Sequence, residues 1–204
     1  MLKTYTGTLR DFVYKELGKE APFLRHTNLS EKRFSRQFTL AQVCINSFGR
    51  SETGEFVRAR YDDLGDFFKA KADIENDDEN LTRIREVLGV LDESFGERAF
   101  TISSRAVAVS AYLFAEDLCV RGKEAQVQKF GAFYVKLLEE IKNNLKLLSK
   151  YREPTNPTIL EGFQRHISQA SVEPYAIKSR DRFLAKAFEY YLDPKTKGKI
   201  IGGE

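Results

Sequence analysis

The amino-acid sequence predicts an all-α protein, an irregular bundle of about seven or eight helices around one central apolar helix. Three observations lead to this prediction. Apolar residues recur at helical spacing along the chain. Only 13 glycines and 5 prolines occur in 204 residues, few for an all-β protein that turns about every eight to twelve residues. Hydrophobic residues make up 42% of the chain, enough for a core in a single domain over residues 1–204.

Residues 77–193 are the most regular part of the sequence and are expected to form the compact helical core. Its first helix follows the acids Asp77–Glu79, which suit the positive end of a helix dipole, and ends at Gly96. The apolar stripe of this helix consists of Leu81, Ile84, Leu88, Leu91 and Phe95. The next helix, about Ser103 to Arg121, is apolar nearly all round over Ala106–Ala115, so we expect it at the centre.

A long helix is expected over about Lys123 to Tyr151. One face carries apolar residues at steps of three and four: Val127, Phe130, Tyr134, Leu137, Ile141, Leu145 and Leu148. At about 1.5 Å per residue, this stripe packs along a neighbour over roughly 30 Å. An intramolecular seam is the favoured interpretation, and a coiled-coil dimer is the alternative.

Prolines divide the rest of the C-terminal half. A helix is expected over about Thr158 to Ala170, and Pro174 opens a last helix over about Tyr175 to Leu192. Pro194 ends that helix. The Lys- and Gly-rich tail, residues 195–204, is expected to be mobile.

Residues 1–70 are less regular. The expected elements are a short helix over Leu9–Leu17, a helix from Ser30 to Phe48 with a break near Thr39, a loop over Gly49–Glu55 and a helix over Tyr61–Ala72. Residues 55–60 are the one stretch with strand-like alternation.

Cysteine usage, the N-terminus and hydropathy exclude several classes of protein. Cys44 and Cys119 each lie alone in an apolar run, which indicates reduced, buried thiols rather than a disulfide framework or a metal pair. The first residues lack the apolar core of a signal peptide, and the longest apolar run is about half of the ~18 residues that span a membrane. We therefore expect a cytoplasmic protein without a membrane partner.

The net charge of +3 comes from 33 Lys and Arg against 30 Asp and Glu, far from the balance of a strongly basic nucleic-acid binder. The charge is unevenly distributed. Residues 71–97 hold nine acids and three bases, a local charge of −6, which leaves +9 for the remainder of the chain. A basic remainder is compatible with contact to phosphate.

The sequence shows no pattern typical of a catalytic or metal site. His26 and His166 are isolated, without a second His or Cys at ligand spacing. The P-loop and the Gly-x-Ser-x-Gly motif are absent, and the acid pairs Asp62-Asp63 and Asp77-Asp78 are explained as helix starts. The sequence thus predicts no catalytic residue, no metal and no cofactor. An enzyme built from scattered residues is the alternative.

The most unusual polar cluster is C-terminal and contains Arg165, His166, Lys178, Arg180 and Arg182. Two helices that meet near Pro174 would bring Arg165, Lys178 and Arg182 together beside the N-terminal amides of the last helix, an arrangement suited to phosphate. The five residues are therefore the candidate site for nucleic acid or phosphate. The alternative is a solvated face on which Asp181 pairs with an arginine.

Five segments, Ile167–Leu184, Phe95–Arg98, Ser104–Ser110, Arg58–Phe68 and Lys32–Phe34, together resemble the helical C-terminal portion of GmrSD-type restriction endonucleases. Members of that family cut DNA through an N-terminal domain of the ParB/sulfiredoxin kind with an Asp-Gly-Gln-Gln-Arg motif. That motif does not occur in this sequence. The resemblance thus implies the helical part of such a system without its catalytic part, and it assigns no catalytic residue here.

Two hypotheses of function follow. The first is a non-catalytic helical module of a GmrSD-like phage-defence or restriction system, with DNA or a catalytic nuclease subunit as partner. The second is a helical adaptor or homo-oligomerisation protein without a nucleic-acid role, which would use the stripe at residues 127–148. Salt-dependent binding of duplex DNA distinguishes the two.

Overall fold

The computed structural model describes residues 2–18, 20–30, 34–151 and 159–200. These residues form helices joined by loops and contain no strand, which confirms the predicted all-α class. The α-helices are α1 (Thr8–Asp11), α2 (Ser35–Thr53), α3 (Tyr61–Ala70), α4 (Glu79–Phe95), α5 (Arg105–Val120), α6 (Glu124–Tyr151), α7 (Ile159–Ser168) and α8 (Pro174–Leu192). Shorter helical turns are η1 (Leu2–Thr4), η2 (Phe12–Glu16), η3 (Leu24–His26), η5 (Gly96–Thr101) and η6 (Pro194–Thr196).

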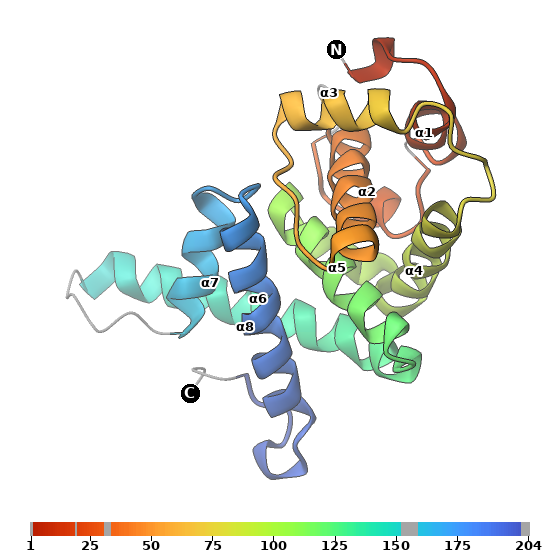
Figure 1. Ribbon diagram of the computed structural model, residues 1–204. Helices are drawn as coiled ribbons and strands as arrows, with labels where there is room; N and C mark the ends of the chain where they lie inside the picture. The colour runs from red at the N-terminus through yellow and green to blue at the C-terminus, as the bar shows by residue number, and fades with distance from the viewer. Residues whose placement is uncertain (1, 19, 31–33, 152–158, 201–204) are drawn as a thin grey trace.

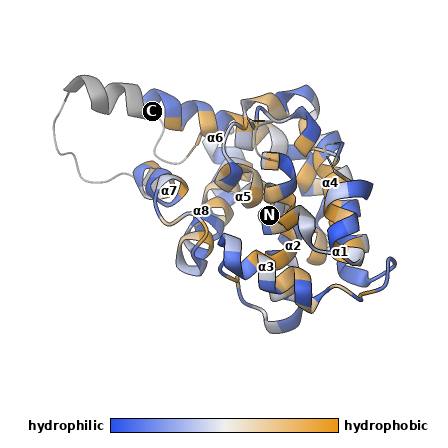
Figure 2. Cartoon of the chain, turned by 90° about the horizontal axis from the view of Figure 1, so that it is seen from above, coloured by the Kyte–Doolittle hydropathy of each residue, from blue (hydrophilic) through white to orange (hydrophobic). Residues whose placement is uncertain are grey.

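The central helix of the bundle is α5, which packs against α2, α4, α6 and α8 (Figure 1). Its buried positions follow one another without a polar face, from Val107 to Glu116, with Leu118 beyond. Apolar residues of α2, α4 and α5 gather between the helices (Figure 2). The expected central apolar helix is therefore present.

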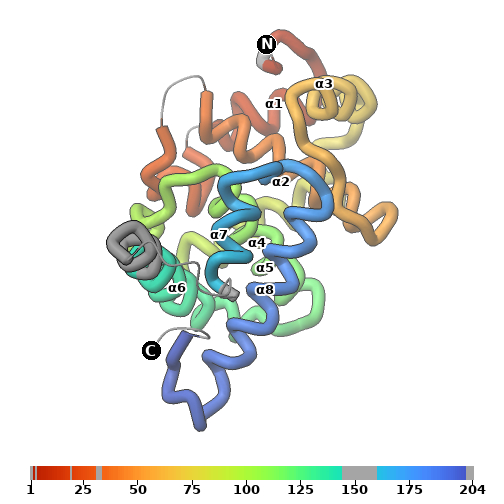
Figure 3. The backbone as a smooth tube through the Cα atoms, turned by 90° about the vertical axis from the view of Figure 1, so that its left-hand side faces the viewer, coloured from red at the N-terminus to blue at the C-terminus, as the bar shows by residue number. Residues whose placement is uncertain are grey.

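Helices α7 and α8 lie side by side on one flank of the bundle (Figure 3). The rings of Phe163 on α7 and Phe183 on α8 are 4.8 Å apart between centroids. Phe188 of α8 reaches the core, where its ring contacts Phe114 of α5 and Phe133 of α6. One face of α8 is thus buried, and the opposite face is left outside the bundle.

The second helix, α2, differs from the sequence prediction. It runs unbroken from Ser35 to Thr53, so the break near Thr39 and the loop from Gly49 were wrong. The Thr39 hydroxyl donates to the Ser35 carbonyl (2.8 Å), which keeps this residue within the helix. Gly49 is buried where a Cβ atom would meet the Val57 side chain, so the glycine reflects a close approach rather than a loop. The expected start at Ser30 was also wrong, because Ser30 lies outside a helix and α2 begins at Ser35. Residues 31–33 lie outside the described residues.

Residues 55–60 form an extended segment rather than the strand that their alternation suggested. Their backbone is bonded to side chains and to a turn, not to another strand. The Val57 amide donates to Asn46 Oδ1 (3.1 Å), and the Ala59 carbonyl accepts from Gln42 Nε2 (3.1 Å). The Ala59 amide donates to the Val172 carbonyl (3.1 Å). Buried side-chain amides of α2 therefore hydrogen-bond to the backbone of this segment, which is not paired with a strand.

The apolar stripe of α6 packs inside the chain. Its members with described side chains are 0–6% exposed: Val127, Phe130, Tyr134, Leu137 and Ile141. The Phe130 and Tyr134 rings contact the Phe95 ring of α4. The favoured intramolecular seam is confirmed for these positions, and they are not free to pair with a second chain. Leu145 and Leu148 lie outside the residues whose side chains are described.

Helices α4 and α6 lie in close contact at Gly131. A Cβ there would collide with the backbone carbonyl of Ser94, and the Gly131 amide donates to Ser94 Oγ (3.0 Å). Since the obstacle is backbone, Gly131→Ala is expected to destabilise the protein by roughly 2–3 kcal/mol, measured by urea unfolding. Gly89→Ala is the control, because its Cβ would meet nothing within 4 Å. A Gly131→Ala protein as stable as wild type would contradict this packing.

Residues 195–200 of the C-terminal tail contact the rest of the chain. Ile200 is 2% exposed, and Lys136 Nζ donates to the Gly198 carbonyl (2.7 Å). Asp193 Oδ1 accepts from the Lys195 amide (2.8 Å) and starts η6. Ile200 is thus an apolar anchor that joins the core. The mobility expected of the tail stays a prediction. Residues 201–204 lie outside the described residues.

Candidate nucleic-acid interface

The structure separates the five candidate residues into two groups. Arg165, Lys178 and Arg182 are exposed and His166 is partly exposed, whereas Arg180 is 0% exposed. Arg180 therefore does not lie on the surface with the other four. The sequence alone did not distinguish these roles, because all five are polar residues of two short helices.

The buried Arg180 side chain of α8 links this helix to the end of α7 and to α5. Its Nη1 donates to the carbonyl of His166 (2.6 Å) and its Nη2 to the carbonyl of Ser171 (2.9 Å). Its Nε donates to Ser110 Oγ on α5 (2.7 Å). The guanidinium thus caps the last turn of α7, where the helix dipole favours a cation. Burial lowers the pKa of Arg180 to about 10, so the group stays charged near pH 7.

His166 contributes its carbonyl to this arrangement rather than a charge. Burial lowers the pKa of its imidazole, and the cations Arg180 and Arg165 lower it further. The ring meets that of Tyr175 edge to face, with 6.0 Å between centroids. A neutral His166 would add little to the attraction of a phosphate at pH 7.

The carboxylate at the N-terminus of α8 makes no hydrogen bond to the amides of that helix. Glu173 is the N-cap residue of α8, and its carboxylate accepts from Arg60 Nε (2.7 Å). A carboxylate near the N-terminus of a helix interacts favourably with the positive end of the helix dipole. The phosphate site at these amides stays a prediction, and the Glu173–Arg60 pair lies beside it.

The outward face of α8 carries a basic stripe, defined here as Lys178, Arg182 and Lys186 at four-residue steps. Lys178 forms an ion pair with Glu55 (3.3 Å). Arg182 and Lys186 are exposed and form no ion pair with any residue that the structure describes. Sequence reasoning missed Lys186, although its spacing from Arg182 was the signal that could have found it.

Exposed aromatic and basic residues flank the basic stripe. Tyr175 is 58% exposed and Tyr190 is 36% exposed, near opposite ends of α8. Three further exposed lysines follow the helix: Lys195, Lys197 and Lys199. Cations interleaved with exposed rings are typical of surfaces that bind nucleic acid, because rings stack on bases while cations contact phosphates.

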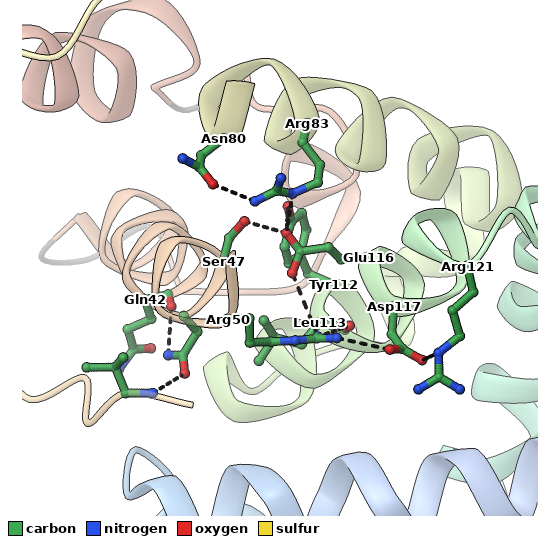
Figure 4. Close-up of polar contacts among 12 residues, drawn as sticks. Gln42, Ser47, Arg50, Asn80, Arg83, Tyr112, Leu113, Glu116, Asp117 and Arg121 are labelled. Atoms are coloured by element: carbon green, nitrogen blue, oxygen red, sulfur yellow. Dashed lines mark hydrogen bonds and ion pairs between the residues drawn. The ribbon is translucent and has the colours of Figure 1, made fainter. Parts of the chain in front are cut away.

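A second polar cluster lies inside the bundle, around Glu116 of α5 (Figure 4). Glu116 is 2% exposed. Its Oε1 accepts from Ser47 Oγ on α2, from Arg83 Nε on α4 (3.1 Å) and from Tyr112 Oη (3.3 Å). Arg50 Nη1 lies 3.7 Å from its Oε2. These contacts join three helices through one buried carboxylate, which points to a structural role.

The cluster continues toward α8. Arg50 Nη2 and Arg121 Nε both bind the Asp117 carboxylate, at 3.1 and 3.0 Å. The half-buried Asp181 of α8 lies nearby, and its Oδ1 has no hydrogen-bond partner among the described residues. Burial raises the pKa of Asp181 to about 6; Arg50 and Arg121 oppose this rise, and Asp117 adds to it. The sequence-based pairing of Asp181 with an arginine of the candidate cluster is not formed.

Asp181 is expected to make stability depend on pH. Its native pKa of about 6 exceeds the ordinary 3.8, so the native state binds more protons between these values. Stability therefore falls as pH rises from about 4 to about 6 and stays lower above that. Asp181→Asn should stabilise the protein at pH 8 by on the order of 1–2 kcal/mol and change little at pH 4. Urea unfolding at both pH values, with exposed Asp73→Asn as control, measures this; equal effects at both pH values would contradict it.

The residues that the structure describes hold no group of three or more His, Cys, Asp or Glu side chains suited to a metal ion. No helix among them is both long and apolar enough to cross a bilayer. Comparison of the chain with protein-family models, curated proteins and solved structures gave no match.

Proposed function

We propose that the chain is a non-catalytic helical module of a GmrSD-like phage-defence or restriction system, acting in the cytoplasm and contacting DNA through the outward face of α8. The observation that carries this proposal is the pair Arg182 and Lys186, exposed at four-residue spacing without a carboxylate partner among the described residues. The motif resemblance at Ile167–Leu184 covers the same helix. DNA phosphates are the natural counter-charge for such a face.

Several other cations of the fold, unlike Arg182 and Lys186, already have an ion-pair partner among the described residues. Arg58 is bound by Asp63, Arg85 by Glu16, and Lys71 by Glu52. These cations already have a carboxylate partner within the chain. A cation without such a partner keeps its full attraction for an external phosphate, apart from screening by salt.

The proposal assigns α8 a positioning rather than a sequence-reading role. Lysine and arginine on one helix face bind the sugar–phosphate backbone without sequence information. The buried contacts of Arg180 with His166 and Ser171 fix α7 against α8, so Arg165 is held on the same hairpin. A catalytic subunit would then act on DNA that this module retains.

The test is a salt titration of duplex DNA binding by the double variant Arg182→Ala, Lys186→Ala. Loss of two phosphate contacts is expected to reduce the slope of log K against log salt by about 2, and the affinity at about 50 mM salt roughly tenfold. The matched control is Lys129→Ala, Lys142→Ala, which removes two exposed cations of α6 that form no ion pair with a described residue. No DNA binding by wild type at about 50 mM salt, or equal losses in both double variants, would refute the proposal.

A further inference from the structure

A groove of about 360 Å³ opens between α4 and α5. The residues that line it are distant in sequence from the basic stripe of α8. Its apolar lining consists of Val87, Val90, Cys119 and Val120. Val120 is 68% exposed, the largest exposed fraction among the large hydrophobic residues of the described chain. Glu86 and Glu124 line the edges of the groove. An exposed aliphatic side chain flanked by carboxylates gives a surface that is apolar at its centre and polar at its rim. Such surfaces are typical of sites that bind another protein.

The two carboxylates of this groove, Glu86 and Glu124, are not neutralised by a cation of the described residues. Glu86 and Glu124 form no ion pair with a described residue. Arg83, the one cation in the lining, is already bound by Glu116 and by Asn80. Burial raises the pKa of the Cys119 thiol to about 11, and Glu124, Glu116 and Glu86 add to this rise. The charges of Glu86 and Glu124 thus both affect the Cys119 thiol.

The negative charge continues along α4 with a helical repeat. Glu79, Glu86 and Glu93 are exposed and lie seven residues apart. At about 1.5 Å per residue they form a row of roughly 20 Å on one side of the helix. None of the three forms an ion pair with a described residue. We call this row and the groove beside it the acidic groove.

We propose that the acidic groove docks an amphipathic helix of a protein partner, whose Lys or Arg residues recur every seven positions beside an aliphatic stripe. The aliphatic stripe would cover Val90 and Val120, and the cations would face Glu79, Glu86 and Glu93. Charges repeating at seven residues match a helix laid along α4, as flanking charges do in paired helices. The negative potential disfavours nucleic acid at this groove.

The first part of the test uses a fluorescein-labelled synthetic peptide of three heptads, with Leu on one stripe and Lys beside it, and fluorescence anisotropy with the full chain. Wild-type protein is expected to bind the helical peptide at least about tenfold more tightly than a peptide of the same composition interrupted by proline. The comparison separates docking of a helix from attraction of charge alone. Equal affinity for both peptides, or no binding at up to about 1 mM, would overturn the proposal.

The second part locates the peptide on the surface. Glu86→Lys with Glu93→Lys is expected to weaken binding at least about tenfold, and Val120→Ser about threefold. The control is Asp62→Lys with Asp66→Lys, the same charge change on the exposed face of α3, which should stay within about twofold of wild type. A control that loses as much as Glu86→Lys with Glu93→Lys would overturn the assignment to α4. DNA binding through α8 is measured separately, so either proposal fails without the other.

Discussion

Arg180→Ala is expected to destabilise the protein by about 3–5 kcal/mol, because three acceptors lose a fully buried donor and each unsatisfied group costs about 1–3 kcal/mol. The acceptors are the carbonyls of His166 and Ser171 and the hydroxyl of Ser110. Without these hydrogen bonds, the end of α7 would no longer be held against α8 and α5. Urea unfolding followed by circular dichroism measures the change.

Two further variants make this prediction specific. Arg182→Ala lies two residues away on the exposed face of α8 and should change stability by less than about 0.5 kcal/mol. Arg180→Lys keeps a cation but cannot reach three acceptors in one plane, so an intermediate loss is expected. If Arg180→Ala were no less stable than Arg182→Ala, the buried contacts would not hold the hairpin.

The buried position of Arg180 limits which variants can test the proposed DNA contact. A variant that changes Arg180 and Arg182 together would lose DNA binding through a loosened hairpin, whatever the role of the surface. Arg182→Ala with Lys186→Ala avoids that ambiguity, because both side chains are exposed.

Glu116→Ala is the second large effect and is expected to cost about 3–5 kcal/mol. Removing the carboxylate leaves Arg83, which is bonded to it, and Arg50, which lies beside it, partly buried without that charge partner. Ser47 and Tyr112 lose the same acceptor. Because the carboxylate joins α2 and α4 to α5, the loss should appear in global unfolding rather than in one helix.

The control for Glu116 is Glu139→Ala, an exposed glutamate of α6. It should change the free energy of unfolding by less than about 0.5 kcal/mol. Glu116→Gln keeps the shape but removes the charge, so it separates the lost ion pairs from the lost volume. Stability of Glu116→Ala within about 0.5 kcal/mol of Glu139→Ala would contradict a structural role for the buried network.

The fold was largely predictable where local signals and apolar periodicity agree. For α4, Asp78 caps the helix by accepting from the Asn80 amide (2.8 Å), and Gly96 takes a φ of 51° where a left-handed residue ends it. Such signals act within one turn and are visible in the sequence. The continuation of α2 through Gly49 was not predictable, because the reason is a contact with Val57 from the following segment.

The polar residues were harder to predict than the helices. Arg180 reads as a surface cation, yet its partners include Ser110, which is 70 positions earlier. Glu116 directly follows the apolar run of α5, a signal of a buried acid, but its partners on α2 and α4 lie 69 and 33 positions away. Which charges are buried is decided by tertiary contacts, and these have no local pattern.

The central claim is that the outward face of α8 contacts DNA phosphates, and lysine footprinting tests it most directly. The wild-type chain is acetylated with and without duplex DNA at about 50 mM salt, and the modified lysines are quantified by mass spectrometry. We expect DNA to protect Lys186 while leaving Lys69 and Lys129, on α3 and α6, as reactive as before. Protection of Lys69 and Lys129 equal to that of Lys186, or no protection of Lys186, would contradict the claim.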